Sequence, residues 1–513
     1  MQVVTGEEMR KIDRFAMDEL GMKEELLMEN AGRAAARQLE KHYGSSAGKK
    51  VAVLIGKGNN GGDGFVIARI LLEKGWHLDT WLLSEAEQFK GAARYHKELY
   101  EHCGYEWQYW SPKTMVHLQD EYSIMIDAML GTGVTGELRE PFKEAAALMN
   151  NSKGKVVSID VPSGIPSGEE PVPDTAVKAD MTITLQAPKV SAYLYPAKHH
   201  YGQLLVTDIG IPAKAMQVQQ DGKREWREGD VVRTLPGRSA AAYKGSHGKG
   251  LLIGGSQKMP GAPAMASSAC LYSGAGLLTA AVPFSAMTAL AASQPEVMLT
   301  PLPEENGYVA PQVTAVNLPI EAYDSIAAGP GLGRGEGTRA LVKHLVSKAD
   351  VPLLLDADGL YFLPELEREV MERRSPLILT PHPGEMAHLA GVSISDVNRH
   401  RFTLSQNYAR QHKCYVVLKG PDTIVTTPEG RQYVNTTGNE ILARGGTGDI
   451  LTGIMLGLVL QKGEISAAAS NAVYLHGYAA DLAVQEEFHS YSMASTDLIR
   501  YLPPAFRSIV SSL

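Results

Sequence analysis

The chain has 513 residues, too many for one ordinary hydrophobic core, so its length predicts two domains. Hydrophobic residues make up 44% and charged residues 21%, the balance of a soluble globular protein, and the formal net charge is -8. The sequence has no long run of Lys or Arg and no apolar run that approaches the length of a membrane span, so neither a nucleic-acid partner nor a membrane is expected.

The cysteines point to a reducing compartment. Cys103, Cys270 and Cys414 lie far apart and are odd in number, so neither a disulfide framework nor a zinc knuckle is expected. Buried thiols in a reducing cytosol are the simplest interpretation. The first twenty residues are charged and amphipathic and lack the hydrophobic stretch of a secretion signal. A cytoplasmic protein is therefore predicted.

The first half of the chain alternates between short apolar runs and helical patterns. Two helices, at about residues 7–20 and 23–42, are predicted before the first strand. The alternation then extends from residue 51 to about residue 208. Strands are predicted at residues 51–56, 78–83, 122–128, 155–160, 180–185 and 203–210, with helices at 61–75, 86–104 and 141–151. This order predicts a parallel sheet with helices on both faces.

Residues 211–230 break the pattern, because they are polar and show no strand. We place the domain boundary there and predict a first domain at 1–212, a linker at 213–227 and a second domain at 228–513. The alternation restarts at residue 249, and the tail from Thr447 is almost wholly helical. Strands and turns of the second half are predicted at residues 250–256, 277–283, 296–302, 324–333, 351–360, 376–385, 415–425 and 431–438.

A glycine-rich loop, GKGNNGGDG, follows the first predicted strand at residues 56–64. It contains the bare Rossmann pattern G-x-G-x-x-G, but the end of the next strand only loosely matches the acidic residue that grips a ribose. Glycines let backbone N–H groups approach a phosphate, and the amides of Asn59 and Asn60 can both donate to and accept from a ligand. Asp63 stands at a predicted helix N-terminus, where it could equally be a cap.

Two later strand ends carry further oxygen side chains. Asp127 ends one predicted strand and precedes a second glycine loop, and Asp160 ends the next strand with Ser163 just beyond. Ligands of open parallel sheets bind outside the carboxyl ends of the strands, so these side chains predict a pocket. Because its side-chain ligands would all be oxygens, the pocket also suits a hard cation.

The motifs GKGNNGGDG, DAMLGTG and IDVPSG, in this order, resemble the YjeF N-terminal family of NAD(P)H-hydrate epimerases over about residues 1–212. The resemblance implies a Rossmann-like three-layer sandwich that interconverts the R and S hydrates, and K⁺ held by Asn60, Asp127 and Ser163. We expect Asp160 to move the proton, although such a carboxylate could equally hold a ribose. The implied hydrate-binding residues are Asp160 together with Asn59, Asn60, Gly61, Gly62, Asp63, Gly131, Thr132, Gly133, Val134, Thr135, Gly136 and Glu137.

The strongest feature of the second half is ILARGGTGDIL, residues 441–451. Its glycines open a predicted helix, so free N–H groups and the helix dipole form an anion hole for a transferring phosphoryl group. Asp449 follows, placed to accept a proton from an attacking hydroxyl. For an isolated motif, an Asp cap in the first helical turn is the alternative. The position after a long α/β stretch and before an apolar helix favours a site.

Three other stretches of the second half support this interpretation. LKGPDTIV, which starts with Leu418, could hold the phosphates or ribose of a nucleotide. TPHPGEM places His382 at a strand end, where it could touch a substrate phosphate, and AAGPGLGRG supplies another glycine loop. Asp356, in DADGL, could line the site or cap a helix.

In order, GAPAMASSACLYSGAGLLT, GPGLG, LDADGL, TPHPGE, KGPDTIV and GGTGD resemble the ADP-dependent NAD(P)H-hydrate dehydratases over about residues 228–513. The resemblance implies a ribokinase-like α/β/α fold in which ADP, with Mg²⁺, phosphorylates the ring hydroxyl of the S hydrate. Loss of phosphate then regenerates NADH or NADPH. It implies a hydrate site of Ala262, Gly333, His382 and the catalytic Asp449, and a nucleotide site of Lys419, Gly420, Pro421, Asp422, Thr423, Gly446, Thr447 and Gly448.

One stretch departs from the dehydratase pattern. The family reads Gly-Asn-Pro-Gly before the anion hole, whereas this chain has Gly438-Asn439-Glu440-Ile441. Arg444 stands before the glycine pair, where it could add positive charge near the phosphates or simply face solvent.

The resulting hypothesis is a repair enzyme with two active sites, an isomerase and a lyase. Its substrates would be the hydrates NADHX and NADPHX together with ADP, and a homo-oligomer is expected. One alternative is a ribokinase-like small-molecule kinase with a fused regulatory domain. The other is a first half that only binds a nucleotide.

Overall fold

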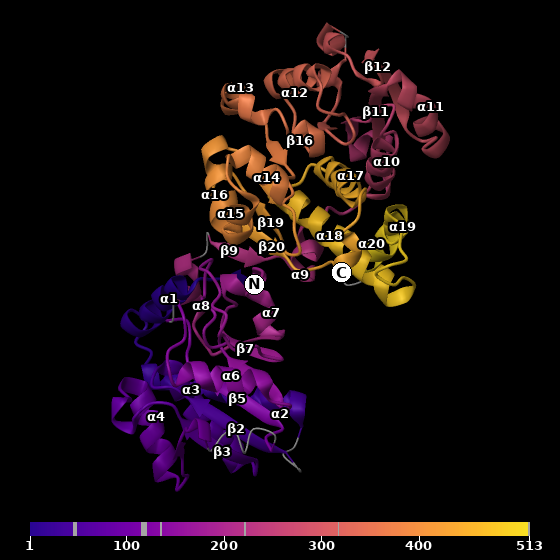
Figure 1. The fold of residues 1–513 in the computed structure, drawn as a ribbon. Helices are drawn as coiled ribbons and strands as arrows, with labels where there is room; N and C mark the ends of the chain where they lie inside the picture. Colours follow the sequence, from indigo (N-terminus) through magenta and orange to yellow (C-terminus); the bar gives the residue numbers. More distant parts are fainter. Residues whose placement is uncertain (45–48, 114–120, 134–135, 220–221, 316–317, 511–513) are drawn as a thin grey trace. The chain divides into compact units, whose positions relative to one another are not determined.

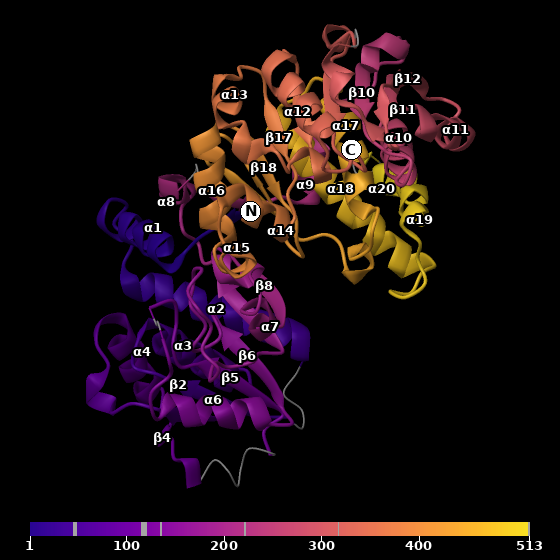
Figure 2. The ribbon, with the colours of Figure 1, turned by 45° about the horizontal axis from the view of Figure 1, so that its top comes forward.

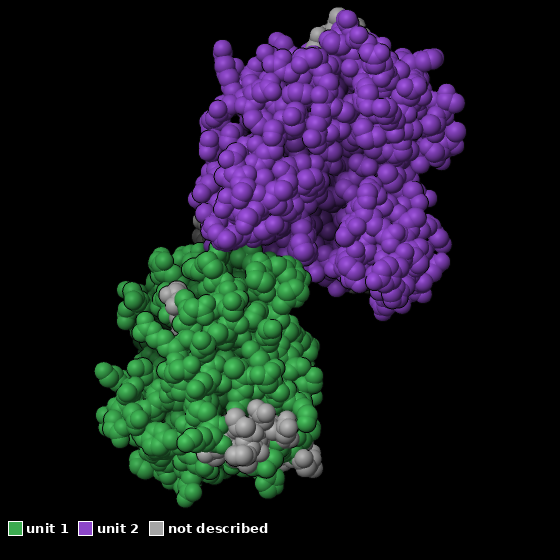
Figure 3. Space-filling view, viewed as in Figure 1, with its two compact units in different colours: residues 1–222 green, residues 223–513 purple. Residues whose placement is uncertain are grey.

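The computed structural model describes residues 1–44, 49–113, 121–133, 136–219, 222–315 and 318–510 (Figure 1). The chain divides into two compact units, Met1–Gly222 and Lys223–Leu513, coloured separately in Figure 3. The division falls inside the segment 213–227, which we predict as a linker. No helix within the described ranges is long and apolar enough to cross a membrane.

Unit 1 is built around a parallel sheet in the order β4-β3-β2-β5-β6-β7-β8. Every strand predicted in this half is present. The strands are β1 (Gln2–Val3), β2 (Lys50–Ile55), β3 (His77–Leu82), β4 (Gln108–Tyr109), β5 (Ile124–Ala128), β6 (Lys155–Ile159), β7 (Met181–Leu185) and β8 (Gln203–Thr207). The helices are α1 (Gly6–Asp18), α2 (Glu24–Tyr43), α3 (Asn59–Glu73), α4 (Gly91–His102), α6 (Phe142–Asn151), α7 (Lys198–Tyr201) and α8 (Ala213–Met216).

Both faces of this sheet are buried, as the apolar runs require. Along β2, Val51, Val53 and Ile55 belong to a core with residues of α1, α2, α3 and α4. Ala52 and Leu54 point to the other face and pack with residues of α6. Side chains of a strand alternate between its two faces, so one continuous apolar run supplies both cores.

Unit 2 contains a sheet in the order β9-β20-β19-β18-β17-β16-β15-β10-β11-β12. Its strands are β9 (Lys223–Glu225), β10 (Lys249–Ile253), β11 (Leu277–Pro283), β12 (Met298–Leu302), β15 (Ser325–Ala328), β16 (Leu353–Leu355), β17 (Leu377–Leu379), β18 (Tyr415–Leu418), β19 (Thr423–Thr426) and β20 (Gln432–Asn435), beside a hairpin of β13 (Glu304–Glu305) and β14 (Tyr308–Val309). The helices are α9 (Glu228–Thr234), α10 (Gly261–Tyr272), α11 (Phe284–Ser293), α12 (Glu336–Lys348), α13 (Glu367–Glu372), α14 (Pro383–Ala390), α15 (Ile394–Arg399), α16 (Arg401–His412), α17 (Thr447–Val459), α18 (Ile465–Glu486), α19 (Ser495–Arg500) and α20 (Leu502–Val510) (Figure 2).

Two features of this sheet differ from the expected pattern. The prediction that residues 211–230 lack a strand is wrong, because β9 lies there and pairs with β20. Its three residues, Lys-Arg-Glu, carry no apolar signal, so only the neighbouring strand defines it. In addition, β18, β19 and β20 pair antiparallel, whereas the strands from β12 to β18 are parallel.

The glycine-rich helix α17 lies against α10 at very short range. A Cβ on Gly453 would lie 2.1 Å from the carbonyl oxygen of Ala266, and one on Gly457 would lie 2.8 Å from that of Cys270. These glycines allow the two backbones to touch. The contact fixes the N-terminus of α17, where the predicted anion hole lies.

The cysteines only partly follow the prediction. Cys270 and Cys414 are buried, and burial raises the pKa of both thiols. Cys103 is exposed, so the prediction of a buried thiol is wrong there. Cys103 directly follows the last residue of α4, where the amphipathic pattern ends.

Candidate active sites

The predicted residues of the first half meet around one cavity of about 500 Å³ in unit 1. The loop after β2, the loop after β5 and the end of β6 all open into it, as expected for the carboxyl ends of parallel strands. Val134 and Thr135 lie outside the described residues. The predicted residues that line the cavity are Asn59, Asn60, Asp63, Gly131, Thr132, Gly133 and Asp160.

Four of the predicted hydrate-binding residues do not line this cavity. Gly61 and Gly62 serve packing, because a Cβ on Gly61 would lie 1.6 Å from the carbonyl oxygen of Gly56 and one on Gly62 would lie 2.3 Å from the sulfur of Met28. The side chain of Glu137 accepts a hydrogen bond from Thr175. Gly136 has a positive φ of 81° and forms a turn.

Asp63 is not a helix cap. Helix α3 begins at Asn59 with Gly58 as its N-cap, so Asp63 is the fifth helical residue. Its side chain is buried and faces the cavity. Burial raises the pKa of Asp63 well above its usual value, and the nearby carboxyls of Asp160 and Asp13 add to the effect.

The three residues predicted to hold K⁺ are brought together. Asp127 is fully buried and accepts hydrogen bonds from the hydroxyl of Ser163 at 2.5 Å and from its backbone N–H at 2.8 Å. The amide nitrogen of Asn60 donates to the carbonyl of Leu130 at 2.9 Å, and the Ser163 hydroxyl is 3.3 Å from the same carbonyl. The amide oxygen of Asn60 is buried and has no hydrogen-bond partner among the described residues.

Asp160 occupies a strained position next to a buried lysine. Its φ is +66°, a left-handed conformation that is uncommon for a non-glycine residue. Lys189 Nζ lies 2.5 Å from Oδ1 of Asp160, and the Lys189 side chain is 1% exposed. An outlier of this kind persists only where the surrounding structure holds it in place, and such outliers cluster at functional sites.

Sequence reasoning missed five charged residues that line this cavity, and two of them, Lys189 and Asp13, lie near Asp160; the others are Arg10, Glu24 and Lys57. Lys189 follows β7, the next strand after β6, so the strand-end rule that selected Asp160 would also have selected it. Asp13 lies on α1 and looks like an ordinary charged residue of an amphipathic helix. Nothing in the sequence around Asp13 indicates that it lines a cavity; only the folded chain shows this.

In unit 2, Lys419 and Asp356 form the centre of the second site. Lys419 Nζ lies 2.8 Å from Oδ1 of Asp356, and the hydroxyls of Thr380 and Thr452 donate to the Asp356 carboxylate at 2.7 Å each. Lys419 is also 3.8 Å from Glu385. The Asp356 side chain caps no N–H group, so the helix-cap alternative is not supported; the carboxylate pairs with Lys419 instead.

The anion-hole loop lies beside this pair. Gly446, with a φ of +98°, is the N-cap of α17, so the free N–H groups of the first helical turn follow it. A Cβ on Gly448 would lie 3.6 Å from Lys419 Nζ. His476, another residue missed from sequence, donates from Nε2 to the Thr447 carbonyl at 3.0 Å. Burial lowers the pKa of His476 to about 4, so its ring is neutral at neutral pH.

Asp449 is the third residue of α17 and makes no capping hydrogen bond from its side chain. Burial raises its pKa from 3.8 to about 7, the nearby Asp356 carboxylate adds to the shift, and Lys419 opposes it. A carboxylate with a pKa near 7 is suited to accept a proton at neutral pH. The predicted base and the predicted anion hole therefore occupy one helical turn.

The turn predicted to bind the nucleotide is held by Arg401, a buried residue that sequence reasoning missed. Its guanidinium donates to the carbonyl of Leu418 at 3.2 Å and to that of Asp422 at 3.0 Å. Gly420 and Pro421 are exposed at the tip of the turn, whereas Asp422 and Thr423 are buried. Arg401 thus supports both ends of the turn.

The predicted hydrate-binding residues of unit 2 come from separate elements: Ala262 from α10, Gly333 from a loop, His382 from the N-cap of α14 and Asp449 from α17. His382 is the N-cap of α14, where Nδ1 accepts from the N–H groups of Gly384 and Glu385 and the rest of the ring is exposed. Gly333 lines a cavity of about 650 Å³, and its N–H donates to Asp358. Ala262 lies near the same loop, because a Cβ on Gly331 would lie 3.1 Å from its Cβ.

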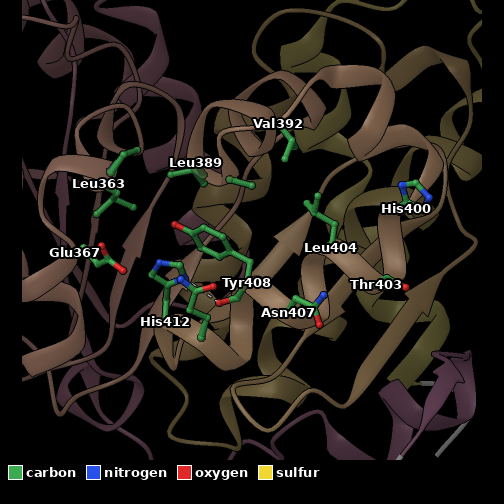
Figure 4. Close-up of a pocket in the computed structure, with 13 residues that line it drawn as sticks. Leu363, Glu367, Leu389, Val392, His400, Thr403, Leu404, Asn407, Tyr408 and His412 are labelled. Carbon is green, nitrogen blue, oxygen red and sulfur yellow. Dashed lines mark hydrogen bonds between the residues drawn. The ribbon is translucent and has the colours of Figure 1, made fainter.

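A third hollow, of about 430 Å³, lies between α13, α14 and α16 (Figure 4). The rings of Tyr408 and His412 stack there with centroids 4.1 Å apart. None of the residues that we predict for a site lines this hollow.

Two family models match the chain. The family described as YjeF-related protein N-terminus matches residues 24–191, and the family described as NAD(P)H-hydrate dehydratase matches residues 250–504. The bifunctional NAD(P)H-hydrate repair enzyme Nnr of Moorella thermoacetica is 35% identical over 99% of this chain and 97% of its own length. This chain belongs to the family of bifunctional NAD(P)H-hydrate repair enzymes.

Other members of the repair-enzyme family and a solved structure agree. The repair enzyme of Thermofilum pendens is 34% identical over 99% of this chain and 97% of its own length. The ADP/ATP-dependent NAD(P)H-hydrate dehydratase of Bacillus subtilis, co-crystallised with ATP and Mg²⁺, is 35% identical, with a TM-score of 0.51. That match covers 56% of this chain and 98% of the Bacillus chain. Both resemblances inferred from the motifs, and the two-domain α/β fold, are confirmed.

The stretch that departs from the repair-enzyme motif contacts both the glycine loop and the C-terminal helices, because the Thr447 hydroxyl donates to the Leu442 and Arg444 carbonyls. Arg444 is exposed, and its guanidinium donates to the carbonyl of Ser490 at 3.0 Å. The Gly438 N–H and the Asn439 amide both donate to Asp481 of α18 at 2.9 Å. Of the two open roles for Arg444, the structure favours the solvent-facing one.

Proposed function

We propose that unit 1 interconverts the R and S hydrates of NADH and NADPH and that unit 2 dehydrates the S hydrate at the expense of ADP. Membership in the repair-enzyme family supports both activities. The observation that carries the second activity is the position of Asp449, whose pKa of about 7 coincides with its place in the first turn of the anion-hole helix. We assign the site residues predicted from the motifs to these two activities, with Asp160 and Asp449 as the catalytic ones and with Gly61 and Gly62 acting through packing of the loop.

For the dehydratase, Asp449 takes the proton of the ring hydroxyl as the hydroxyl oxygen attacks the terminal phosphoryl group of ADP. The bond from phosphorus to the leaving AMP oxygen breaks, and the N–H groups after Gly446 and the ammonium of Lys419 balance the charge. Phosphate then leaves with the electrons of the carbon–oxygen bond, and loss of a proton from the neighbouring ring carbon restores the dihydronicotinamide. Mg²⁺ would accompany the nucleotide and neutralise its phosphate oxygens.

For K⁺, the donor set of unit 1 fits. Asn60 presents a buried amide oxygen with no partner among the described residues. Burial raises the pKa of Asp127, so the ionised form of this carboxyl gains from a nearby positive charge. One carboxylate combined with neutral oxygens suits a monovalent cation. Among the described residues, no group of three or more His, Cys, Asp or Glu side chains could hold a metal ion. The ion would supply a fixed positive charge between the loops that carry Asn60, Asp127 and Ser163.

The decisive experiment incubates the full chain with a mixture of R and S hydrates, with and without ADP and Mg²⁺, and follows the absorbance of the reduced cofactor. Complete recovery is expected. Asp160→Asn should limit recovery to the S fraction, and Asp449→Asn should abolish it. No recovery with any nucleotide would contradict the proposal, and a stable phosphorylated product would instead indicate a small-molecule kinase.

A further inference from the structure

The cavity of unit 1 contains more carboxyl groups than one base requires. Asp13 of α1, Asp63 of α3 and Asp160 at the end of β6 all line it, together with the ammonium of Lys189. Several ionised carboxylates in one buried site repel each other, and Lys189 forms its ion pair with only one of them, Asp160. The cavity is therefore built to hold carboxyl groups in different protonation states.

Lys189 distinguishes Asp160 from the other carboxyls. Its Nζ lies 2.5 Å from Oδ1 of Asp160, and the backbone N–H of Leu185 donates to the same oxygen at 3.1 Å. Lys189 is itself fixed by the carbonyl of Ala187 at 3.0 Å. Among the described residues, the hydrogen bonds to the Asp160 carboxylate all reach Oδ1. Oδ2 is thus the oxygen available to a ligand in the cavity.

Asp13 lies in a different environment. It is half-buried on α1, and no ion pair of its carboxyl occurs among the described residues. Burial raises the pKa of Asp13 from 3.8 to about 6, Lys189 opposes the shift, and Asp160 adds to it. The other charged or titratable groups that line the cavity are Arg10, Glu24, Lys57, Asp63, Asp160 and Lys189. With its pKa raised to about 6, Asp13 is protonated below that pH and can then serve as a general acid.

We propose that Asp13 and Asp160 are the acid and the base of the first site, and that Lys189 positions Asp160 as the base. The proposal rests on the epimerase function proposed above. The hydroxyl carbon of a hydrated dihydronicotinamide is bonded to the ring nitrogen. Oδ2 of Asp160 takes the hydroxyl proton while the carbon–nitrogen bond breaks, and the carbon becomes an aldehyde. The electron pair of the broken bond goes to nitrogen, which takes the proton of Asp13.

Inversion then needs no other reactant. Rotation about the bond next to the aldehyde turns its other face towards the nitrogen. The nitrogen attacks that face, returns its proton to Asp13, and the new hydroxyl takes its proton from Asp160. The ring closes with the opposite configuration, and both side chains regain their starting states. No redox partner is consumed.

The acid is tested with Asp13→Asn, which keeps the shape but has no acidic proton. We expect the epimerisation kcat to fall about 100-fold, with a much smaller change in KM. The loss of kcat/KM above about pH 6, caused by ionisation of Asp13 in the wild type, should disappear from the residual activity. Asp13→Glu should restore that pH limb. Asp18→Asn, the same change on an exposed residue of α1, is the matched control.

Lys189 is tested with Lys189→Met in the full chain. The epimerisation kcat should fall much more than KM changes, because Asp160 loses the ammonium that holds its Oδ1 in place. Lys189→Arg should restore kcat towards the wild-type value, which a purely structural role does not predict. The dehydratase rate of the same sample reports whether unit 2 is folded. If Lys189→Met unfolds unit 1, Lys189→Arg and the Asp13 variants test the acid–base assignment instead.

Two results separate the possible failures. A wild-type chain that does not epimerise the hydrates contradicts the proposed function itself. A wild-type chain that epimerises, beside an Asp13→Asn variant with unchanged rate and pH profile, overturns only the acid–base assignment.

Discussion

Lys419 and Asp356 form a buried ion pair, with Nζ 2.8 Å from Oδ1, although 63 positions separate them in the chain. Burial would raise the pKa of Asp356, but Lys419 and the hydroxyls of Thr452 and Thr380 hold it below its usual value. The pair therefore keeps an ionised carboxylate and an ammonium next to the anion hole. Besides burial, the Asp356 carboxylate raises the pKa of Asp449, whereas Lys419 opposes the shift.

Removing one partner of the Lys419–Asp356 ion pair should strongly lower the free energy of unfolding. Lys419→Met leaves a buried carboxylate without its counter-charge and should lower the free energy of unfolding by about 3 to 5 kcal/mol. Chemical denaturation of the full chain measures the loss. Lys343→Met, which breaks an exposed pair with Glu369, is the control and should cost less than about 1 kcal/mol.

A double variant separates the ion pair from simple packing. If the pair is the cause, Asp356→Asn combined with Lys419→Met should cost less than the sum of the two single changes. Additive losses would contradict the assignment of an ion pair.

The raised pKa of Asp449 predicts how the dehydratase rate depends on pH. The base acts in its ionised form, and its pKa is raised to about 7, so kcat/KM should increase as pH rises through about 7. Initial rates of cofactor recovery from the pure S hydrate with ADP measure the profile. A rate that is already constant from pH 5 upwards would exclude Asp449 as the titrating base.

Asp449 should affect stability in the opposite direction: its contribution to the free energy of unfolding should fall as pH rises. Because the folded chain raises the pKa of Asp449, the folded state binds this proton more tightly than the unfolded state. This contribution is present at low pH and is lost as pH rises through about 7. Asp449→Asn should therefore increase Tm more at pH 8 than at pH 5, by about 3 °C, while abolishing dehydration.

The proposed potassium site predicts that the epimerisation rate depends on K⁺. Asn60→Ala removes the unpartnered amide oxygen and should raise the K⁺ concentration for half-maximal epimerisation about tenfold, which corresponds to about 1.4 kcal/mol of binding free energy. Epimerisation of the pure R hydrate at constant ionic strength, with choline replacing K⁺, measures it. Asn59→Ala, at the neighbouring position, should change KM for the hydrate and leave the K⁺ midpoint in place. Equal rates in K⁺ and choline would rule out the site.

In the glycine loop at residues 56–64, a methyl side chain should be costly at one glycine and tolerated at another. A Cβ on Gly61 would lie 1.6 Å from the Gly56 carbonyl oxygen, so Gly61→Ala must move the backbone and should destabilise the chain by about 3 kcal/mol. A Cβ on Gly58 would meet nothing within 4 Å, so Gly58→Ala should cost less than about 1 kcal/mol. Thermal unfolding of both variants compares the two sites, and equal losses would contradict the steric explanation.

Much of the fold could be predicted because its signals are local. Parallel strands buried on both faces require continuous apolar runs, and β2 and β5 show them directly. The strand-end rule located Asn60, Asp127 and Asp160, since the carboxyl ends of neighbouring parallel strands meet at one edge. The motif around Asp449 identified the base and the anion hole together, because both belong to one helical turn.

The sequence by itself thus determined the α/β class, the two units and the loops that carry the chemistry. Only the tertiary structure decided the neighbours of those loops: Asp13 beside Asp160, Lys189 against Oδ1, Asp356 against Lys419, and β9 beside β20. A periodic pattern of apolar residues indicates which side of a helix or strand is buried. It does not indicate which other segment of the chain covers that side. The ionisation of a buried carboxyl depends on the charge of its spatial neighbours, so the roles of these acids became visible only when distant segments packed together.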